Sequence, residues 1–248
     1  MPFDIKVPRD GSPAAWINEG LSDEGGSVSS FVPGCFTSYA RALHPASTLE
    51  GTFVTWSDVA AKEGLRVDGD TLWHSTDGSQ RWGKSIGAKW QGGAPQVSLP
   101  RAMLMQLCFL LEQHSQPDEK CFFGLWDGWG RSEYRKLWQL IETPHGTKLS
   151  LAKGDSAPRF GVPPSAGRDY FLVSGPVRVA VELVDIGLNA PNFIWPADQS
   201  WLVVSDIDLD STLVGGDDAL TQSIVSSKEL EAFRISQDVP LIGDPTHP

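Results

Sequence analysis

Three aspartates at alternate positions near the C-terminal end of the chain have the residue type and spacing of a metal site. Asp206, Asp208 and Asp210 follow an apolar run over residues 201–204. Alternate side chains of a β-strand point to the same face, so a strand over residues 201–210 would align the three carboxylates. Carboxylate oxygens are the preferred ligands of Mg²⁺ and Ca²⁺, which makes a site for one of these cations a hypothesis.

The mutual repulsion of three aligned carboxylates has to be offset. The source can be a bound cation, solvent, or an arginine from a neighbouring strand, such as Arg41 or Arg168. Because arginine and solvent are the commoner solutions, we expect no cofactor and keep Mg²⁺ or Ca²⁺ as the alternative. The five histidines are isolated in the sequence, and the three cysteines form no C-x-x-C pair, so no zinc motif is present.

The stretch from Asp208 to Leu213 reads D-L-D-S-T-L after an apolar run and resembles the first motif of the haloacid-dehalogenase-like phosphotransferases. The resemblance implies Asp208 as nucleophile, Asp210 as general acid and base, and Mg²⁺ between carboxylate and phosphate. In that family the motif opens a Rossmann-like domain with a downstream lysine and a further acidic pair. Here residues 215–248 follow, with Lys228 as their only lysine. We therefore favour an acidic strand end and keep a metal-dependent phosphate-ester hydrolase as the alternative function.

A second candidate site is the turn that follows the apolar run over residues 120–126. Trp126 and Trp129 flank Asp127 in this glycine-containing turn. Two indoles around a carboxylate at a strand end can stack on a ligand or anchor a protein partner, and tryptophan is enriched in interface hot spots. We also include Arg41 and His44 among the binding residues. The alternative is a β-turn whose indoles fold back onto the core.

The composition limits the classes of function. The 248 residues carry a formal charge of −11, which argues against binding to nucleic acid or to an anionic membrane surface. The charge is compatible with a basic protein partner, although acidity alone serves solubility. No apolar run reaches the ~20 residues of a membrane span. The sequence begins M-P-F-D, without the pattern of a signal peptide, so a cytoplasmic location is expected.

Short strands mixed with helices at irregular spacing predict one α+β domain over residues 1–248, with a mixed or largely antiparallel sheet and long loops. A helix over residues 99–114 is apolar on nearly every side and is expected to be buried. The other expected helices cover residues 57–63, 176–187, 217–224 and 228–233. The expected strands cover residues 3–7, 36–44, 51–56, 120–126, 168–174 and 201–210, with a rigid turn at 192–196 and long loops at 8–30, 66–98 and 144–168.

Several segments resemble those of an uncharacterised group of bacterial, mainly actinobacterial, cytoplasmic proteins. They are the run Y-A-R-A-L-H-P at residues 39–45, the segment 122–130, and residues 195–216. The resemblance implies one continuous domain and a cytoplasmic location, but no assigned activity. From these patterns we predict a non-enzymatic cytoplasmic protein of an immunity-type or regulatory role, which binds a partner such as a basic protein. The oligomeric state is left open.

Overall fold

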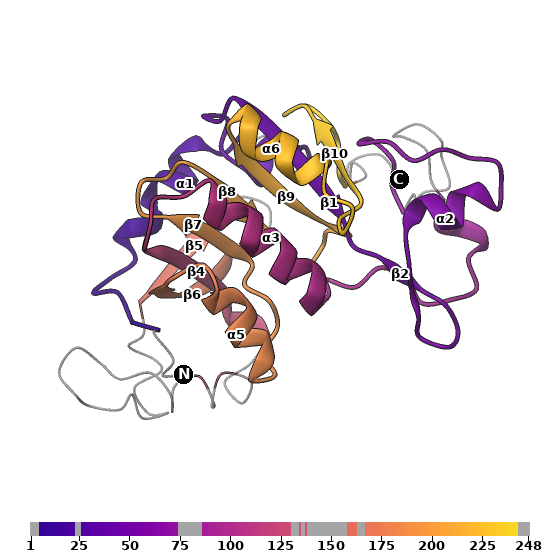
Figure 1. Cartoon of the computed structure of the whole chain (residues 1–248). Coiled ribbons are helices and arrows are strands. Elements are labelled where there is room, and N and C mark those ends of the chain that lie inside the picture. The colour runs from indigo at the N-terminus through magenta and orange to yellow at the C-terminus, as the bar shows by residue number, and fades with distance from the viewer. Residues whose placement is uncertain are drawn as a thin grey trace.

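The computed structural model describes residues 5–22, 26–73, 86–129, 134, 137, 158–162 and 167–242, and it confirms the α+β class (Figure 1). The strands are β1 Ser38–Leu43, β2 Ala46–Ser47, β3 Phe53–Val54, β4 Cys121–Trp126, β5 Arg159–Val162, β6 Arg168–Gly175, β7 Phe193–Pro196, β8 Leu202–Val204, β9 Ser211–Gly216 and β10 Ala232–Ile235. The α-helices are α1 Ala15–Gly20, α2 Trp56–Ala61, α3 Arg101–Gln113, α5 Val179–Asp185 and α6 Asp218–Val225; short 3-10 helices are η1 Ser12–Ala14, η2 Val28–Ser30, η4 Gly87–Lys89 and η5 Asp127–Trp129.

Eight strands form one antiparallel sheet in the order β10-β1-β9-β8-β7-β4-β6-β5. β4 lies inside the sheet between β7 and β6, as its apolar sequence predicts. Its side chains alternate between two cores: Phe123 and Leu125 belong to the core on one face, and Phe122 belongs to the core on the other. A strand buried on both faces reads as a continuous apolar run, because neither face alternates with water.

Three helices, α3, α5 and α6, cover one face of the sheet (Figure 1). α3 lies between the other two. Arg101 at its start forms an ion pair with Asp185 at the end of α5, and His114 after its end lies 3.0 Å from the hydroxyl of Ser223 in α6. α6 begins where Asp217 accepts a hydrogen bond from the backbone N–H of Leu220 at 2.7 Å, which is an N-terminal cap.

The opposite face of the sheet carries a second, aromatic core, which packs against α1 and η2. Other segments of the chain contact the outer edges of the two outermost strands, β5 and β10. Asn18 donates a hydrogen bond to the carbonyl of Gly161 in β5 at 2.6 Å, and Gly11 lies against the carbonyl of Arg159. At the other side of the sheet, a Cβ added at Gly69 would lie 2.9 Å from the carbonyl of Arg234 in β10.

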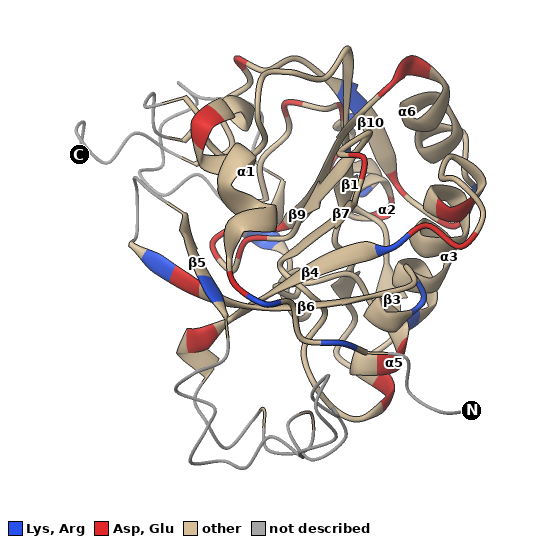
Figure 2. Cartoon of the chain, turned by 90° about the vertical axis from the view of Figure 1, so that its left-hand side faces the viewer, with Lys and Arg blue, Asp and Glu red and all other residues tan. Residues whose placement is uncertain are grey.

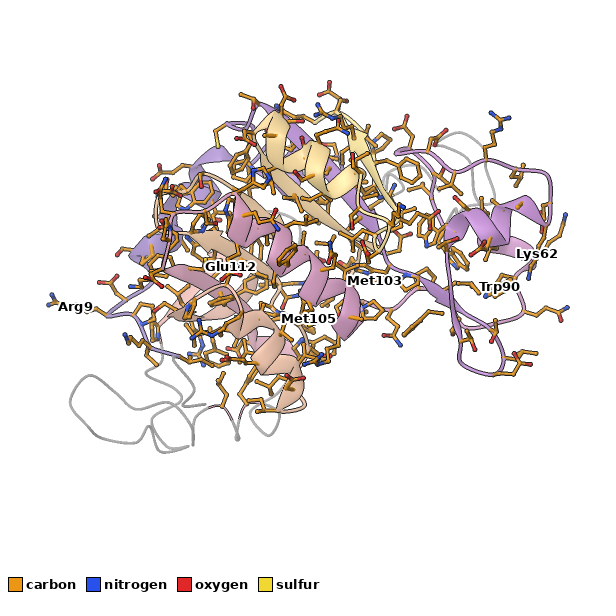
Figure 3. The ribbon with its side chains drawn as sticks, in the orientation of Figure 1. Arg9, Lys62, Trp90, Met103, Met105 and Glu112 are labelled. Carbon is orange, nitrogen blue, oxygen red and sulfur yellow. The ribbon has the colours of Figure 1, made fainter. Side chains whose placement is uncertain are left out.

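A small lobe projects from the side of the sheet that carries β1, β9 and β10 (Figure 1). We define the lobe as residues 46–73 and 86–97, which include β2, β3 and α2. Its own core contains Trp56 and Trp73, whose ring centroids are 5.3 Å apart. At its surface, the ammonium of Lys62 lies 4.6 Å from the centre of the Trp90 ring, and Figure 3 labels both side chains.

Thr55 caps α2 and forms a capping box with Asp58, so the helix begins one residue before the predicted range of 57–63. The start of α2 is also held by the main body of the protein. The carboxylate of Glu231, just before β10, accepts hydrogen bonds from the backbone N–H groups of Trp56 and Ser57 at 2.6 and 2.8 Å.

Several predicted elements differ in the structure. The strand expected over residues 201–210 ends at Val204 and is followed by a loop over residues 205–210. The turn expected at residues 192–196 is strand β7, and the helix expected over residues 228–233 is a turn followed by β10. The expected loop at residues 8–30 contains α1. Strands β7 and β10 each pair with a strand distant in sequence, β7 with β4 and β10 with β1.

Parts of three predicted elements lie outside the described residues: residues 3–4 of the strand expected over 3–7, residues 74–85 of the loop expected over 66–98, and most of the loop expected over 144–168. Within the described part of the second loop, residues 159–162 form β5 rather than a loop. None of the helices in the described ranges is long and apolar enough to cross a lipid bilayer.

Candidate functional site

The residues predicted to form a site come from elements that end or begin at the same end of the sheet. β1, β8 and β4 run in the same direction, because β9 separates the first two and β7 the last two, each antiparallel to its neighbours. Their C-terminal ends therefore lie together, beside the beginning of β6. The residues fall there into two clusters, which we name the Arg168 cluster (Trp126, Arg168, Asp206 and Asp208) and the lobe anchor (Arg41, His44 and Asp210).

The Arg168 cluster is built around one guanidinium group. Arg168 donates hydrogen bonds from Nη1 to Asp206 Oδ1 at 2.6 Å and from Nη2 to Asp208 Oδ2 at 2.5 Å. Its Cζ atom lies 5.7 Å from the centre of the Trp126 ring, a cation–π distance. Burial lowers the pKa of Arg168, but the hydrogen bonds to the two carboxylates outweigh this effect, so the pKa is raised and the arginine stays charged.

An arginine thus offsets two of the three carboxylates, which was one of the expected solutions. It does not come from an adjacent strand: β6 lies three positions away from β8 in the sheet. The side chain of Asp206 is 9% exposed and that of Asp208 is 54% exposed, so the outer carboxylate faces solvent. Beneath them, burial and then the charge of Asp206 raise the pKa of Tyr170.

The loop over residues 205–210 is held in place by backbone and amide hydrogen bonds. Asp206 Oδ1 also accepts a hydrogen bond from the backbone N–H of Asp208 at 2.9 Å. Asn192 donates to the carbonyl of Ser205 at 2.8 Å and accepts from the backbone N–H of Trp126 at 3.0 Å, so it joins this loop to the end of β4. The sequence places Asn192 only in a turn, and no local pattern indicates this bridging role.

The turn after β4 has features of both predicted alternatives, because its indoles pack against the core and also stay partly exposed. Trp126 and Trp129 are half-buried, with ring centroids 5.2 Å apart in an edge-to-face arrangement, and they pack against the two different cores of the sheet. Asp127 is 35% exposed and lies 3.0 Å from Nε of Arg159, as an ion pair without hydrogen-bond geometry. The guanidinium of Arg159, which the sequence did not single out, lies over the Phe171 ring at 4.5 Å.

The lobe anchor is buried and fully engaged in the fold. Arg41, with no exposed side-chain surface, donates hydrogen bonds to the carbonyls of Gly69 and Thr71, both at 2.9 Å. It also donates to Ser211 Oγ at 2.8 Å and to Asp210 Oδ1 at 2.9 Å. Arg41 therefore fixes residues 69–71 of the lobe to the sheet and is not placed to contact a partner.

His44 is equally buried and has a partner at each ring nitrogen. Nδ1 lies 2.7 Å from the carbonyl of Gln96 and donates to it, because a carbonyl can only accept. Nε2 then accepts a hydrogen bond from Thr212 Oγ1 at 2.8 Å, and Thr212 Oγ1 in turn lies 2.5 Å from Ser205 Oγ. Burial lowers the pKa of His44 to about 4, so the ring is neutral near pH 7 and joins the lobe to β9.

The three aspartates do not converge. Asp206 and Asp208 bind Arg168, whereas Asp210 binds Arg41 on the lobe side. Within the described residues, no group of three or more His, Cys, Asp or Glu side chains is arranged to hold a metal ion. The D-L-D-S-T-L segment runs from the loop after β8 into β9, and these two strands are antiparallel, so the segment lacks the parallel-strand context of the phosphotransferase motif. The metal-site hypothesis therefore gains no geometric support.

Comparison with models of protein families found no match. Comparisons with curated proteins and with solved structures found none either. The resemblance to the actinobacterial group stays a prediction, and the function has to be inferred from the chemistry of the chain itself.

The arrangement at this end of the sheet is suited to recognition. The Arg168 cluster and the neighbouring Asp127–Arg159 pair present half-buried indoles beside partly exposed charged groups. Three carboxylates, those of Asp127, Asp206 and Asp208, pair here with two arginines. The surface is therefore aromatic and net acidic, which favours a partner with cationic and aromatic or aliphatic groups.

Proposed function

We propose that this chain is a cytoplasmic protein-binding protein, of an immunity-type or regulatory role, which engages a basic protein through the Arg168 cluster and the adjoining turn at Asp127 and Trp129. The observation that carries the proposal is that Arg168 joins the indole of Trp126 and the exposed carboxylate of Asp208 into one surface. The segment near residues 126–129, predicted to bind a partner, and the segment at 206–208, predicted as a metal site or an acidic strand end, both contribute to the proposed surface.

The physical properties of this surface support protein recognition. Half-buried tryptophans lose little conformational entropy when a partner covers them, and they provide large contact areas. Asp208, at 54% exposure, keeps one oxygen for Arg168 and has surface left for an incoming Lys or Arg. The net charge of −11 would speed association with a basic partner through long-range attraction.

The test is affinity capture with three immobilised proteins: the wild type, Asp208→Lys, and Glu50→Lys as a matched control. Glu50 is an exposed acid on the lobe, so this control makes the same change of charge away from the proposed site. A partner identified by mass spectrometry on the wild type and the Glu50→Lys column should be missing from the Asp208→Lys column. With that partner purified, calorimetry should show at least a tenfold loss of affinity for Asp208→Lys.

The charge reversal could also act by displacing Arg168 rather than by repelling the partner. Asp208→Asn removes the charge but keeps a hydrogen-bond acceptor near Arg168, and we expect it to weaken binding by a smaller factor. A partner held equally by all four proteins would overturn the proposal, as would a partner lost equally from both lysine variants.

A further inference from the structure

α3 exposes apolar side chains on the face that points away from the sheet. The sequence predicts that this helix is buried on nearly every side, but Met105 is 50% exposed and Phe109 is 55% exposed. Its inward residues, Leu104, Leu107 and Leu111, are at most 3% exposed and lie in the core beneath. The expectation of an all-round buried helix is therefore wrong, and the apolar outer face requires its own explanation.

The exposed apolar side chains form a continuous stripe. Ala102, Met105 and Phe109 are exposed and follow one another at intervals of three or four residues, with the exposed Glu112 at the end of the same row along the helix. Figure 3 labels Met105 and Glu112 on α3, which crosses the front of the sheet. We call this row the α3 stripe. A Met side chain can adapt its contacts to a partner, and apolar residues at this helical spacing are typical of helices that bind another helix or a groove.

α3 is fixed on both sides, so the stripe is held on a rigid support. On one side Arg101 Nη2 donates to Asp185 Oδ2 of α5 at 2.8 Å. On the other side Gln106 lies 3.4 Å from the hydroxyl of Ser227, and His114 lies 3.0 Å from that of Ser223. A preorganised helix loses little conformational entropy when it binds a partner.

The charges around the α3 stripe favour a cationic partner. The helices α3, α5 and α6 with their capping residues carry five carboxylates (Glu112, Glu182, Asp185, Asp217 and Asp218) and two arginines (Arg101 and Arg178). Both arginines already pair with the two acids of α5, and Arg234 of β10 pairs with Asp218, so the carboxylates that remain for a partner are those of Glu112 and Asp217. Acidic segments recur along these helices in Figure 2. With Arg234 included, this surface keeps two more carboxylates than arginines, so a second copy of this chain would place net negative charge against itself, whereas a cationic partner would neutralise it.

We infer that the α3 stripe is a docking surface for a basic amphipathic helix of a partner protein, with the apolar side of that helix over Met105 and Phe109 and its Lys or Arg residues near Glu112. This surface shares no residue with the Arg168 cluster, so either proposal can fail without the other.

The experiment uses a fluorescent peptide of lysine and leucine in helical spacing as the probe. α3 has 13 residues and spans about 20 Å at 1.5 Å per residue, so a peptide of about 14 residues matches it. Fluorescence anisotropy would be measured with the full-length protein at about 0.15 M and about 0.5 M salt, since screening removes the purely ionic part of binding. We expect the double variant Met105→Gln, Phe109→Gln to bind the peptide at least tenfold more weakly at both salt concentrations.

A matched control comes from the lobe, where Leu49 is 79% exposed and Phe53 is 46% exposed. The double variant Leu49→Gln, Phe53→Gln removes a comparable apolar area and should bind the peptide as the wild type does. Both double variants change exposed side chains, and their unchanged melting temperatures would verify folding. A peptide of glutamate and leucine should bind at least tenfold more weakly than the lysine peptide.

Four outcomes would overturn the inference. They are no binding of the lysine peptide by the wild type, binding by the α3 double variant within twofold of wild type, an equal loss in both double variants, and equal binding of the acidic peptide. Light scattering would provide a fifth: if the wild type dimerises and the α3 double variant is monomeric, the surface takes a second copy instead.

Discussion

Replacement of Arg41 by methionine would remove the central contact between the lobe and the sheet. The substitution keeps much of the apolar stem and removes the guanidinium, which donates to Gly69, Thr71, Ser211 and Asp210. Two backbone carbonyls of the lobe would lose the guanidinium as donor, and the carboxylate of Asp210 would keep the backbone N–H of Trp73, which donates to its Oδ2 at 3.3 Å. The guanidinium also lies over the Trp56 ring at 5.6 Å, so the change would reach the core of the lobe.

The expected cost follows from how well water can replace the lost partner. Removal of one member of a buried ion pair costs about 3–5 kcal/mol. Since the Asp210 side chain is 27% exposed, water can solvate part of the remaining carboxylate, and we expect the lower end, about 3 kcal/mol. Against a typical free energy of unfolding of about 5–15 kcal/mol, this is a large loss.

Urea denaturation followed by tryptophan fluorescence would measure the change, as a midpoint lowered by about 1 M if the m-value is about 3 kcal/mol/M. Limited proteolysis at low urea should show earlier cleavage within residues 46–73. Arg234→Met is the control, because Arg234 and Asp218 are 43% and 73% exposed and should contribute about 0–1 kcal/mol. A loss for Arg41→Met no larger than that of Arg234→Met would refute the assigned role of Arg41.

Three further predictions concern the pKa of His44, the Glu231 cap of α2 and the exposure of the cysteines. Burial lowers the pKa of His44 from 6.5 to about 4; the unfolded chain therefore binds the extra proton between these pH values, and stability should fall by roughly 3 kcal/mol as the pH drops through this range. His44→Gln should remove this part of the pH dependence in urea titrations at pH 7 and pH 4.5, and an unchanged dependence would contradict the buried neutral state. Glu231→Ala should destabilise α2 by about 1–2 kcal/mol, seen as faster hydrogen exchange at Trp56 and Ser57, while unaltered exchange would mean that Thr55 alone caps the helix. Ellman's reagent should titrate the exposed Cys35 at once and Cys108 and Cys121 only in denaturant, because burial raises the pKa of both buried thiols to about 12; a second fast thiol in native protein would contradict this.

Elements whose own residues decide their structure were predictable from the sequence. β4 and β6 are apolar runs, and α6 has both a capping aspartate and helical spacing. β10 was not predictable in this way, because Ser226 and Glu229 suggest a capping box while pairing with β1 decides the outcome. A local cap contributes about 1 kcal/mol, and the hydrogen bonds and side-chain packing of a full strand outweigh it.

The site was predictable in its residues but not in its arrangement. The sequence singled out Trp126, Asp206 and Asp208 separately and named Arg168 as one possible counter-charge. Which arginine meets which carboxylate depends on strand order, because Arg168 and Asp206 are 38 residues apart and belong to elements separated by two strands. Periodicity along one segment carries no information about strand order. The exposed face of α3 was missed for the same reason, since whether a fourth layer covers a helix is a property of the whole fold.

The coverage of the outermost strands limits how this protein can assemble. An open strand edge is a template that other chains extend through backbone hydrogen bonds, with little regard to their sequence. Here Asn18 occupies a carbonyl of β5, and Gly69 lies against one of β10. Growth into a continuous intermolecular sheet is thereby opposed at both sides. Association through side chains is favoured instead, and a surface of side chains can be altered one substitution at a time, so partner choice can change without a change in the backbone.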